Sequence, residues 1–416
     1  MESVMGKIMN KDIKNLLILC VLAFLIFAFS DNPPISISEQ EYETKKEGSF
    51  REQGPGFIEE KFLPAAIIKA STSTESEIKK STFKAPEIIK AIYLTSWSAA
   101  TPSMVDYAID LAQNTEINAV VIDIKDWSGY VNYDTQVPEV EKYNAKRVLI
   151  RDIGALIEKF HEEGIYTIAR ITVFQDPILA WARPDLAVRR KSDKSLLWLD
   201  RSGLAWIDPA AKESWDYNIA IAQDALSQGF DELNFDYVRF PSDGDLGDLS
   251  FSLWDSTSTT RIATIKEFYS YLRENIPDAV LSVDLFGLST VSSRFGVGQN
   301  IENAYDYFDF VCPMVYPSHY VSMYLGYENP AEYPYEIVKH SMESALARLK
   351  VFNEIFPTKA KLRPWLQDFD LGAEYDKDMV RLEINAVSDA LEEDFSGFML
   401  WSADNFYTRD ALLIAD

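Results

Sequence analysis

Short apolar runs alternate with longer amphipathic segments from residue 88 to the end of the chain. The apolar runs are rich in β-branched and aromatic residues, which is typical of strands buried on both faces. They cover residues 91–97, 119–125, 166–172, 233–239, 280–285, 310–316, 362–367 and 398–401. Segments with a helical period lie between them, at residues 148–162, 214–227, 261–274, 335–353 and 377–393. Eight strands separated by helices predict an α/β fold, a (β/α)8 TIM barrel. An open doubly wound sheet is the alternative, but no glycine-rich phosphate loop follows a predicted strand.

The links between these predicted elements differ in length. Helix-to-strand links are short, whereas the links after the third to sixth strands are long. Insertions therefore collect at the carboxyl ends of the strands, where this fold builds its active sites. Many tryptophans lie on the same rim, and an indole there can stack on a sugar ring or simply pack a loop. We expect some of the four tryptophans in the long loops to wall a cleft: Trp181, Trp198, Trp206 and Trp254.

The residues before the predicted barrel have a different character. Three lysines precede an apolar stretch at residues 16–29, a layout typical of a signal peptide or short anchor. The following residues are rich in Ser, Thr, Glu, Lys and Pro and show no period, which predicts disorder. We therefore divide the chain into a signal peptide or membrane anchor at 1–30, a disordered linker at 31–87 and a barrel at 88–416. Export to the cell envelope or the extracellular space follows as an expectation, with a possible N-terminal membrane tether.

Composition narrows the possible partners. The 416 residues are 47% hydrophobic, which is enough for a large core. A formal net charge of −25 argues against nucleic acid, because phosphates would be repelled, and favours a neutral or cationic partner. Of the two cysteines, Cys20 lies in the apolar N-terminal stretch, so Cys312 has no partner in the barrel and no intramolecular disulfide is expected.

Strand alternation places polar side chains inside the predicted barrel. Outward positions face helices and should be apolar, so the polar positions of each strand point inward. Asp236 on the fourth strand and Asp284 on the fifth are therefore predicted to face the same interior. The same parity turns inward Asp123 and Lys125, Arg170 and Thr172, Met314 and Tyr316, and Trp365 and Gln367. Carboxylates from several strands should then converge with Lys125, Arg170 and Tyr316 near the carboxyl ends.

Two carboxyl groups in unequal surroundings can supply the acid and the nucleophile for cleavage of a glycosidic bond. Asp236, near a cation such as Arg170 or Arg239, is expected to stay ionised and act as nucleophile, with Asp284 as the acid. Because neighbouring strands lie about 4.8 Å apart, we expect a retaining mechanism through a covalent intermediate. Asp368 is an alternative acid. The alternative to catalysis is a buried ion-pair network that fixes the barrel register.

Further residues on the predicted rim are candidates for substrate binding. They are Asp123, Lys125, Asp126, Arg170, Arg239, Tyr316, His319, Trp365, Gln367, Asp368 and Trp401. Among the three histidines, only His319 lies on this rim, so no metal is expected, and a zinc-dependent polysaccharide deacetylase is disfavoured. No cofactor is expected either.

Several of these segments together resemble a family of bacterial glycoside hydrolase domains. The runs are IYLTSW at 92–97, VIDIKD at 121–126, NFDYVRFP at 234–241, SVDLFG at 282–287, PMVYPSHY at 313–320 and RPWLQD at 363–368. The resemblance implies an exported carbohydrate-active enzyme with a TIM barrel distantly related to the α-amylase type. In that type the strand-four Asp is the nucleophile, as Asp236 would be, but the strand-five acid is a Glu, where this chain has Asp284. We expect an extracellular or cell-envelope polysaccharide or oligosaccharide as substrate; a non-catalytic glycan-binding barrel is the rival.

Overall fold

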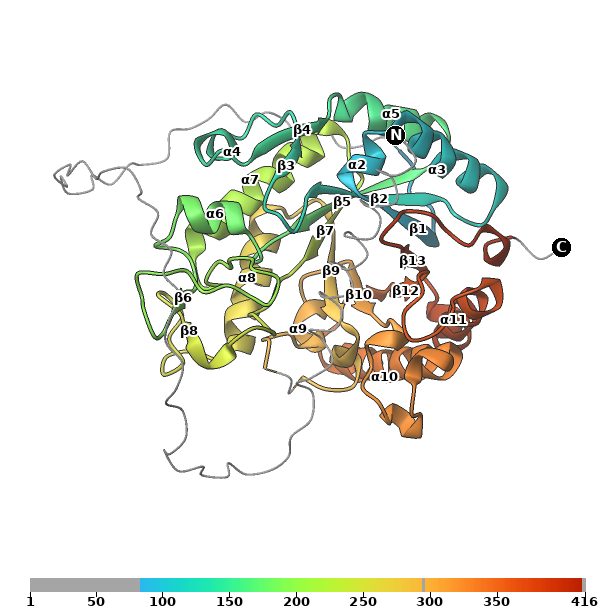
Figure 1. Cartoon of the computed structure of the whole chain (residues 1–416). Helices are drawn as coiled ribbons and strands as arrows, with labels where there is room; N and C mark the ends of the chain where they lie inside the picture. The colour runs from blue at the N-terminus through green and yellow to red at the C-terminus, as the bar shows by residue number, and fades with distance from the viewer. Residues whose placement is uncertain (1–82, 294–295, 414–416) are drawn as a thin grey trace, which may run out of the picture. The chain divides into compact units, whose positions relative to one another are not determined.

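A computed structural model describes residues 83–293 and 296–413, and within them a closed barrel of parallel strands (Figure 1). The barrel strands in order are β1 (Ile89–Leu94), β2 (Ala119–Lys125), β5 (Tyr166–Thr172), β7 (Glu232–Asp236), β9 (Val280–Phe286), β10 (Phe310–Met314), β11 (Lys361–Leu362) continued by β12 (Trp365–Gln367), and β13 (Gly397–Trp401). β1 pairs with both β2 and β13, which closes the ring. The predicted (β/α)8 TIM barrel is confirmed. The predicted signal segment and nearly all of the predicted linker lie outside the described residues.

Helices cover the outside of this barrel. They are α3 (Pro102–Asn114), α5 (Ile153–Glu162), α7 (Lys212–Gln228), α8 (Arg261–Asn275), α9 (Ile301–Tyr305), α10 (Pro334–Ile355) and α11 (Lys377–Leu391). α10 and α11 pack against each other (Figure 1). α7 ends at Gly229, whose φ of 111° is accessible to glycine without a steric penalty, and this allows a tight link into β7. No helix of the described part of the chain is long and apolar enough to span a membrane.

Two apolar layers follow from strand alternation. Outward side chains such as Ile122 and Phe235 join the large core beneath the helices. Inward side chains such as Val121, Ile168 and Met399 form a smaller cluster in the lumen. Below the polar residues, at the amino ends of the strands, Glu232 and Arg363 form a fully buried ion pair. The lumen is therefore a packed core with its polar groups in layers.

Local backbone geometry ends or divides three of the predicted elements, and the sixth and seventh strands also differ from their predicted bounds. The first strand ends at Leu94 rather than residue 97, because the hydroxyl of Thr95 accepts a hydrogen bond from the Ser98 backbone and starts the short helix α2 (Ser96–Ala99). The fourth strand ends at Asp236 rather than 239, because Tyr237 has a positive φ of 54°. The predicted helix at 148–162 is divided. Its first part belongs to strand β4 (Lys146–Ile150), which pairs with β3 (Val131–Tyr133), and the helix begins after residue 152.

The long connections lie at the carboxyl ends of the strands, as predicted. The loop after β5 carries α6 (Pro177–Ala182) and β6 (Arg189–Arg190), and β6 pairs with β8 (Leu249–Ser250) from the loop after β7. Helix α4 (Pro138–Lys142) lies in the connection after β2. The loops after β5 and β7 are thus joined through the small antiparallel sheet of β6 and β8.

The register between strands sets which inward residues share a level. Phe235 of β7 pairs with Val283 of β9, so the next residues, Asp236 and Asp284, are level with each other on adjacent strands. On the other side of β7, Thr172 of β5 pairs with Asp236. The sheet thus brings the two aspartates predicted from alternation to the same height at the rim.

Candidate active site

Three carboxyl groups surround one guanidinium inside the barrel. Arg170 of β5 contacts Asp123 of β2 through Nη1 at 2.6 Å. Its Nη2 donates to Oδ2 of Asp236, and its Nε lies 3.6 Å from Oδ2 of Asp284. Burial by itself would lower the pKa of Arg170, but the charges of Asp123 and Asp236 raise it well above its ordinary value. Arg170 therefore remains a cation shared by three acids.

Asp236 is held by main-chain geometry as well as by Arg170. The left-handed conformation of Tyr237 costs on the order of 1–3 kcal/mol in a residue other than glycine. In that conformation the backbone N–H of Tyr237 donates to Oδ1 of Asp236 at 2.5 Å. Both carboxylate oxygens thus accept N–H donors, one from the backbone and one from Arg170. This arrangement suits an ionised carboxylate.

Asp284 has drier surroundings. Its Oδ1 accepts hydrogen bonds from Nδ2 of Asn234 at 2.9 Å and from Nε1 of Trp365 at 2.7 Å. Its Oδ2 is buried and accepts no hydrogen bond within the described chain. Burial, followed by the charge of Asp236, raises the pKa of Asp284 to about 8. Asp284 therefore keeps its proton at neutral pH.

Asp123 forms the third corner of the cluster. Tyr93 of β1 donates its hydroxyl to Oδ2 of Asp123 at 2.5 Å, while Arg170 contacts the other oxygen. Burial raises the pKa of Asp123, against the opposing effect of Arg170. Tyr93 was missed by the sequence reasoning, although its neighbours Ile92 and Leu94 are apolar and outward-facing, so alternation alone could have found it.

An aromatic wall adjoins the carboxyl groups and consists of Tyr93, Tyr316, His319, Phe369 and Trp401. Ring centroids lie 5.1 Å apart for Tyr316 and His319, 5.8 Å for Tyr316 and Phe369, and 5.0 Å for Phe369 and Trp401. Tyr93 stacks on Trp401 at 6.3 Å. Burial lowers the pKa of His319 to about 4, so its imidazole is neutral at pH 7. Phe369 was not predicted for this site; it follows the end of β12 by two residues.

The charges of Asp284 and Asp236 also affect the pKa of Tyr316 in the aromatic wall. Burial, followed by the charges of Asp284 and Asp236, raises the pKa of Tyr316 well above its ordinary value. The phenol of Tyr316 is therefore protonated at neutral pH. It can donate a hydrogen bond beside the two carboxyl groups.

Lys125 does not join this cluster. The register between β2 and β5 shifts between Asp123 and Lys125, which redirects the lysine. Its Nζ forms a buried ion pair with Asp176 at 2.8 Å, donates to the Thr172 carbonyl, and lies 5.8 Å from the ring centre of Tyr217 on α7. The expected convergence of Lys125 with the inward carboxylates is therefore not what the structure shows.

Asp126 lies next to the cluster, but its carboxylate bonds to the turn after β2 and to strands β3 and β4. Its carboxylate contacts Arg147 at 2.7 Å and accepts from Nδ2 of Asn132 at 3.0 Å and from the Ser128 backbone N–H at 2.9 Å. These bonds fix the turn between β2 and β3.

Two predicted residues after β12 connect loops. Oε1 of Gln367 accepts from the hydroxyl of Ser318 at 2.7 Å. Asp368 accepts from the Thr408 backbone N–H at 2.9 Å and from its hydroxyl at 2.7 Å, one on each carboxylate oxygen. Burial raises the pKa of Asp368 to about 6. The structure thus ties Asp368 to the segment after β13, and the carboxylates that contact Arg170 among the described residues are those of Asp123, Asp236 and Asp284.

Arg239 is enclosed by aromatic rings. Its guanidinium lies 4.7 Å from the ring centres of Trp206 and Phe286 and 5.1 Å from that of Tyr237. Nη1 donates to the hydroxyl of Ser242 at 3.0 Å. Burial lowers the pKa of Arg239. Arg170, and not Arg239, is the cation that contacts Asp236.

The loop tryptophans divide between packing and exposure. Trp198 and Trp206 are buried, and their indole N–H groups donate to the Asp245 carbonyl at 2.8 Å and to the Asp200 carboxylate at 2.9 Å. Trp254 packs against Phe240 and Phe251 inside the loop after β7. Trp181 is 64% exposed. Three of these four rings therefore hold the loops together.

The described residues offer no ready-made metal centre. Within 83–293 and 296–413, no group of three or more His, Cys, Asp or Glu side chains is arranged to hold a metal ion. His161 pairs with Asp231 at 2.8 Å, at the amino end of β7. His340 lies on α10, outside the barrel.

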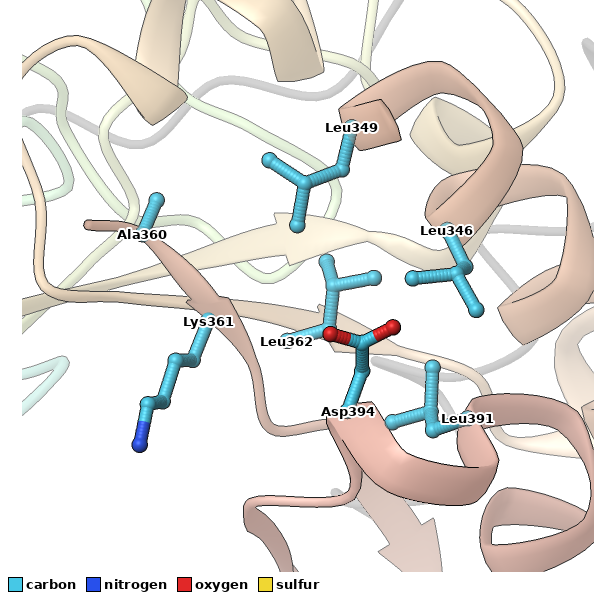
Figure 2. A pocket seen from close by; sticks show the side chains of 7 residues that line it. All are labelled: Leu346, Leu349, Ala360, Lys361, Leu362, Leu391 and Asp394. Atoms are coloured by element: carbon cyan, nitrogen blue, oxygen red, sulfur yellow. The ribbon is translucent and has the colours of Figure 1, made fainter. Parts of the chain in front are cut away.

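A hollow lies away from the carboxyl cluster, between α10, the start of β11 and the end of α11 (Figure 2). Its lining is Leu346, Leu349, Ala360, Lys361, Leu362, Leu391 and Asp394. Because these residues lie at the amino end of the seventh strand, the hollow belongs to the rim opposite Asp236. Its lining includes no member of the cluster.

Comparison with known proteins identifies the domain type. A family model described as "Putative glycosyl hydrolase domain" matches residues 91–407. A hypothetical protein from Ruminiclostridium thermocellum ATCC 27405 is 38% identical, over 46% of this chain and 96% of its own, with a TM-score of 0.43. The PgaB (BpsB) glycoside hydrolase domain from Bordetella bronchiseptica is 14% identical over 79% of this chain and 100% of its own, with a TM-score of 0.54, and shares the fold. A comparison with curated proteins found no match.

Proposed function

Because the chain belongs to the family of glycosyl hydrolase domains, we propose that it cleaves a polysaccharide with Asp236 and Asp284 as its two working carboxyl groups. The observation that carries this assignment is the shared Arg170. It contacts both aspartates at the carboxyl ends of adjacent strands, while the rest of their surroundings differ. That combination is what a two-carboxylate glycosidase requires.

Asp236 is the nucleophile in this proposal. Its oxygens accept hydrogen bonds from the backbone N–H of Tyr237 and from Arg170, so the carboxylate is fixed in position beside a cation. In the first step a bond forms between a carboxylate oxygen and the anomeric carbon as the glycosidic C–O bond breaks.

Asp284 is the acid. At neutral pH it carries a proton, and the two donors on Oδ1 leave Oδ2 to bear it. In the first step this proton passes to the departing glycosidic oxygen. Once Asp236 is esterified its negative charge is gone, so the pKa of Asp284 falls and the carboxylate can accept a proton from the attacking water. The water oxygen then bonds to the anomeric carbon, and the ester to Asp236 breaks.

The proposed stereochemical outcome is retention. Adjacent strands lie about 4.8 Å apart, and the two aspartates are level with each other. Retaining pairs are about 5–5.5 Å apart, whereas inverting pairs are wider to admit a water. The spacing of the backbone therefore favours a covalent intermediate.

The aromatic wall supports a sugar as the ligand. Aromatic rings can pack against the C–H face of a pyranose while nearby polar groups bind its hydroxyls. In this site the rings of Tyr316 and Trp401 lie beside the cluster formed by Asp123, Asp236 and Asp284.

The substrate is proposed to be an extracellular or cell-envelope polysaccharide, because residues 1–30 have the composition of an export signal or anchor. Fractionation of cells that produce the full chain tests this localisation. Recovery of the protein with the cytoplasmic fraction would contradict it.

An activity screen against envelope and extracellular glycans tests the enzymatic proposal, with Asp236→Asn as the inactive variant. Asp185→Asn is a matched control, since this carboxylate is an exposed partner of Arg183. We expect hydrolysis by the wild type and the control, and none by Asp236→Asn. Glycan retention without hydrolysis in all three proteins would indicate a binding barrel instead.

A further inference from the structure

Three tryptophans on the catalytic rim expose much of their surface. Trp97 on α2 is 62% exposed, Trp127 after β2 is 46% exposed, and Trp181 on α6 is 64% exposed. Single exposed apolar side chains are common, whereas several that lie together on one rim can mark a binding site for a ligand or partner. The mechanism above uses none of the three.

The three indoles belong to one connected stretch of surface. The guanidinium of Arg147 lies 5.8 Å from the ring centre of Trp97 and 4.7 Å from that of Tyr130. Tyr130 and Trp127 are in the same turn after β2. Nε2 of Gln175 lies 3.4 Å from the Trp127 carbonyl.

The same turn also reaches α6, which carries Trp181. A side chain at Gly129 would collide with Asp176 and Ile178, at the start of this helix. The contacts thus run without a break from α2 through the β2–β3 turn to α6.

This stretch borders the carboxyl cluster. Tyr93 lies on β1, and Trp97 follows it by four residues, beyond the end of the strand. Asp123 lies on β2, and Trp127 follows it by four residues, again beyond the end of the strand. Trp181 lies in the loop that leaves β5 after Arg170. Tyr93, Asp123 and Arg170 are linked by hydrogen bonds on three neighbouring strands. Each exposed indole therefore lies beyond the end of a strand that carries one of these three residues.

We propose that Trp97, Trp127 and Trp181 form a binding strip for successive sugar units of a polysaccharide that extends from the reacting bond. The inference rests on the proposed function for its location, and it adds a binding site outside the cluster. The sugar polymer is taken to be neutral or cationic, since the chain carries a net charge of −25.

The spacing of polar groups within the strip favours a sugar chain over a second copy of the protein. The guanidinium of Arg147, which pairs with Asp126, lies against the rings of both Trp97 and Tyr130, so a charged group lies among the aromatic rings of the strip. A sugar polymer offers the matching alternation of apolar ring faces and hydroxyl groups. A protein interface of the usual kind has a continuous apolar centre instead.

Retention in gels that contain a soluble polymer tests the strip. The polymers are a β-glucan, a galactan and a partly deacetylated poly-N-acetylglucosamine. The proteins are the wild type, Trp97→Ala, Trp127→Ala, Trp181→Ala and the triple variant. Phe356→Ala is the matched control, because Phe356 is 57% exposed near the start of β11 on the opposite rim. Thermal melts check that all variants fold.

We expect one of the polymers to retain the wild type and the control, and each single variant to bind it roughly three- to tenfold more weakly. Affinity for oligomers should rise with chain length in the wild type and stay nearly flat in the triple variant. Retention of the triple variant equal to that of the wild type would overturn the inference. Failure of all three polymers to retain the wild type, or self-association of the wild type that the triple variant lacks, would overturn it as well.

The two proposals fail separately. A wild type that binds polymer through the three indoles but hydrolyses nothing would remove the enzymatic proposal and leave the strip. Hydrolysis with unchanged retention by the tryptophan variants would do the reverse.

Discussion

The indole of Trp365 on β12 donates a hydrogen bond to Oδ1 of Asp284 on β9, although β10 lies between the two strands. Asn234 on β7 donates to the same oxygen from the opposite side. The flanking strands thus fix the orientation of the carboxyl group and determine which of its oxygens can release a proton. The orientation of the Asp284 carboxyl group consequently depends on residues of three strands, β7, β9 and β12.

Replacing Trp365 by Phe should move the alkaline limb of the pH–rate profile upward. The Trp365 N–H stabilises the ionised form of Asp284, so its loss raises the pKa of this acid further, by about one unit. The limb is measured from kcat between pH 6 and 10. Trp215→Phe is the control, because this buried indole bonds the Pro209 carbonyl far from the cluster. A limb that stays in place or moves downward in Trp365→Phe would contradict the acid assignment.

Asp284→Asn should stabilise the protein increasingly as pH rises from 4 to 8. In the unfolded chain Asp284 ionises near pH 4, but in the fold it keeps its proton until about pH 8. The wild type therefore loses stability across this window, on the order of 5 kcal/mol at most, and the asparagine variant does not. Melting temperatures at pH 4, 6 and 8 measure the difference. Asp185→Asn should show no such rise, because Arg183 lowers the pKa of that exposed carboxylate.

Asp236→Ala should reduce hydrolysis by roughly 10³-fold or more, and added azide should restore part of it. Removal of the carboxylate leaves space for the small anion beside Arg170, where it can attack the anomeric carbon in place of Asp236. Mass spectrometry should detect the glycosyl azide. Normal turnover by Asp236→Ala would exclude it as the nucleophile.

The first product released from a defined substrate should keep the anomeric configuration of that substrate. This follows from a double displacement at Asp236. Proton NMR in the first minutes of the reaction, before mutarotation, distinguishes the two anomers. An inverted product would require Asp236 to act as a base toward water.

Much of this arrangement could be predicted from the sequence because a parallel barrel imposes strict alternation. Asp236, Asp284 and Arg170 each alternate along their strand with apolar residues that face outward, so the pattern predicts that their own side chains point inward. The order of the strands then places them together. The catalytic assignments themselves remain predictions.

The departures arise where local backbone geometry interrupts alternation. A register shift after Asp123 directs Lys125 to Asp176, and nothing in the residue pattern announces it. The positive φ of Tyr237 ends β7 early, although tyrosine rarely adopts this conformation. The sequence could not show that Trp198 and Trp206 are buried while Trp181 is exposed, because burial in a long loop depends on how the loop folds back on its neighbour.

The single guanidinium at the centre of the barrel also acts as a charge filter. Arg170 offers one positive charge to three acids, so ionisation of any two leaves an excess of negative charge where the sugar must lie. A uronic acid or a sialic acid would be repelled there, whereas a sugar with a free amine would be attracted. The same ion pairs that hold the aspartates in place would therefore decide which glycans can approach them.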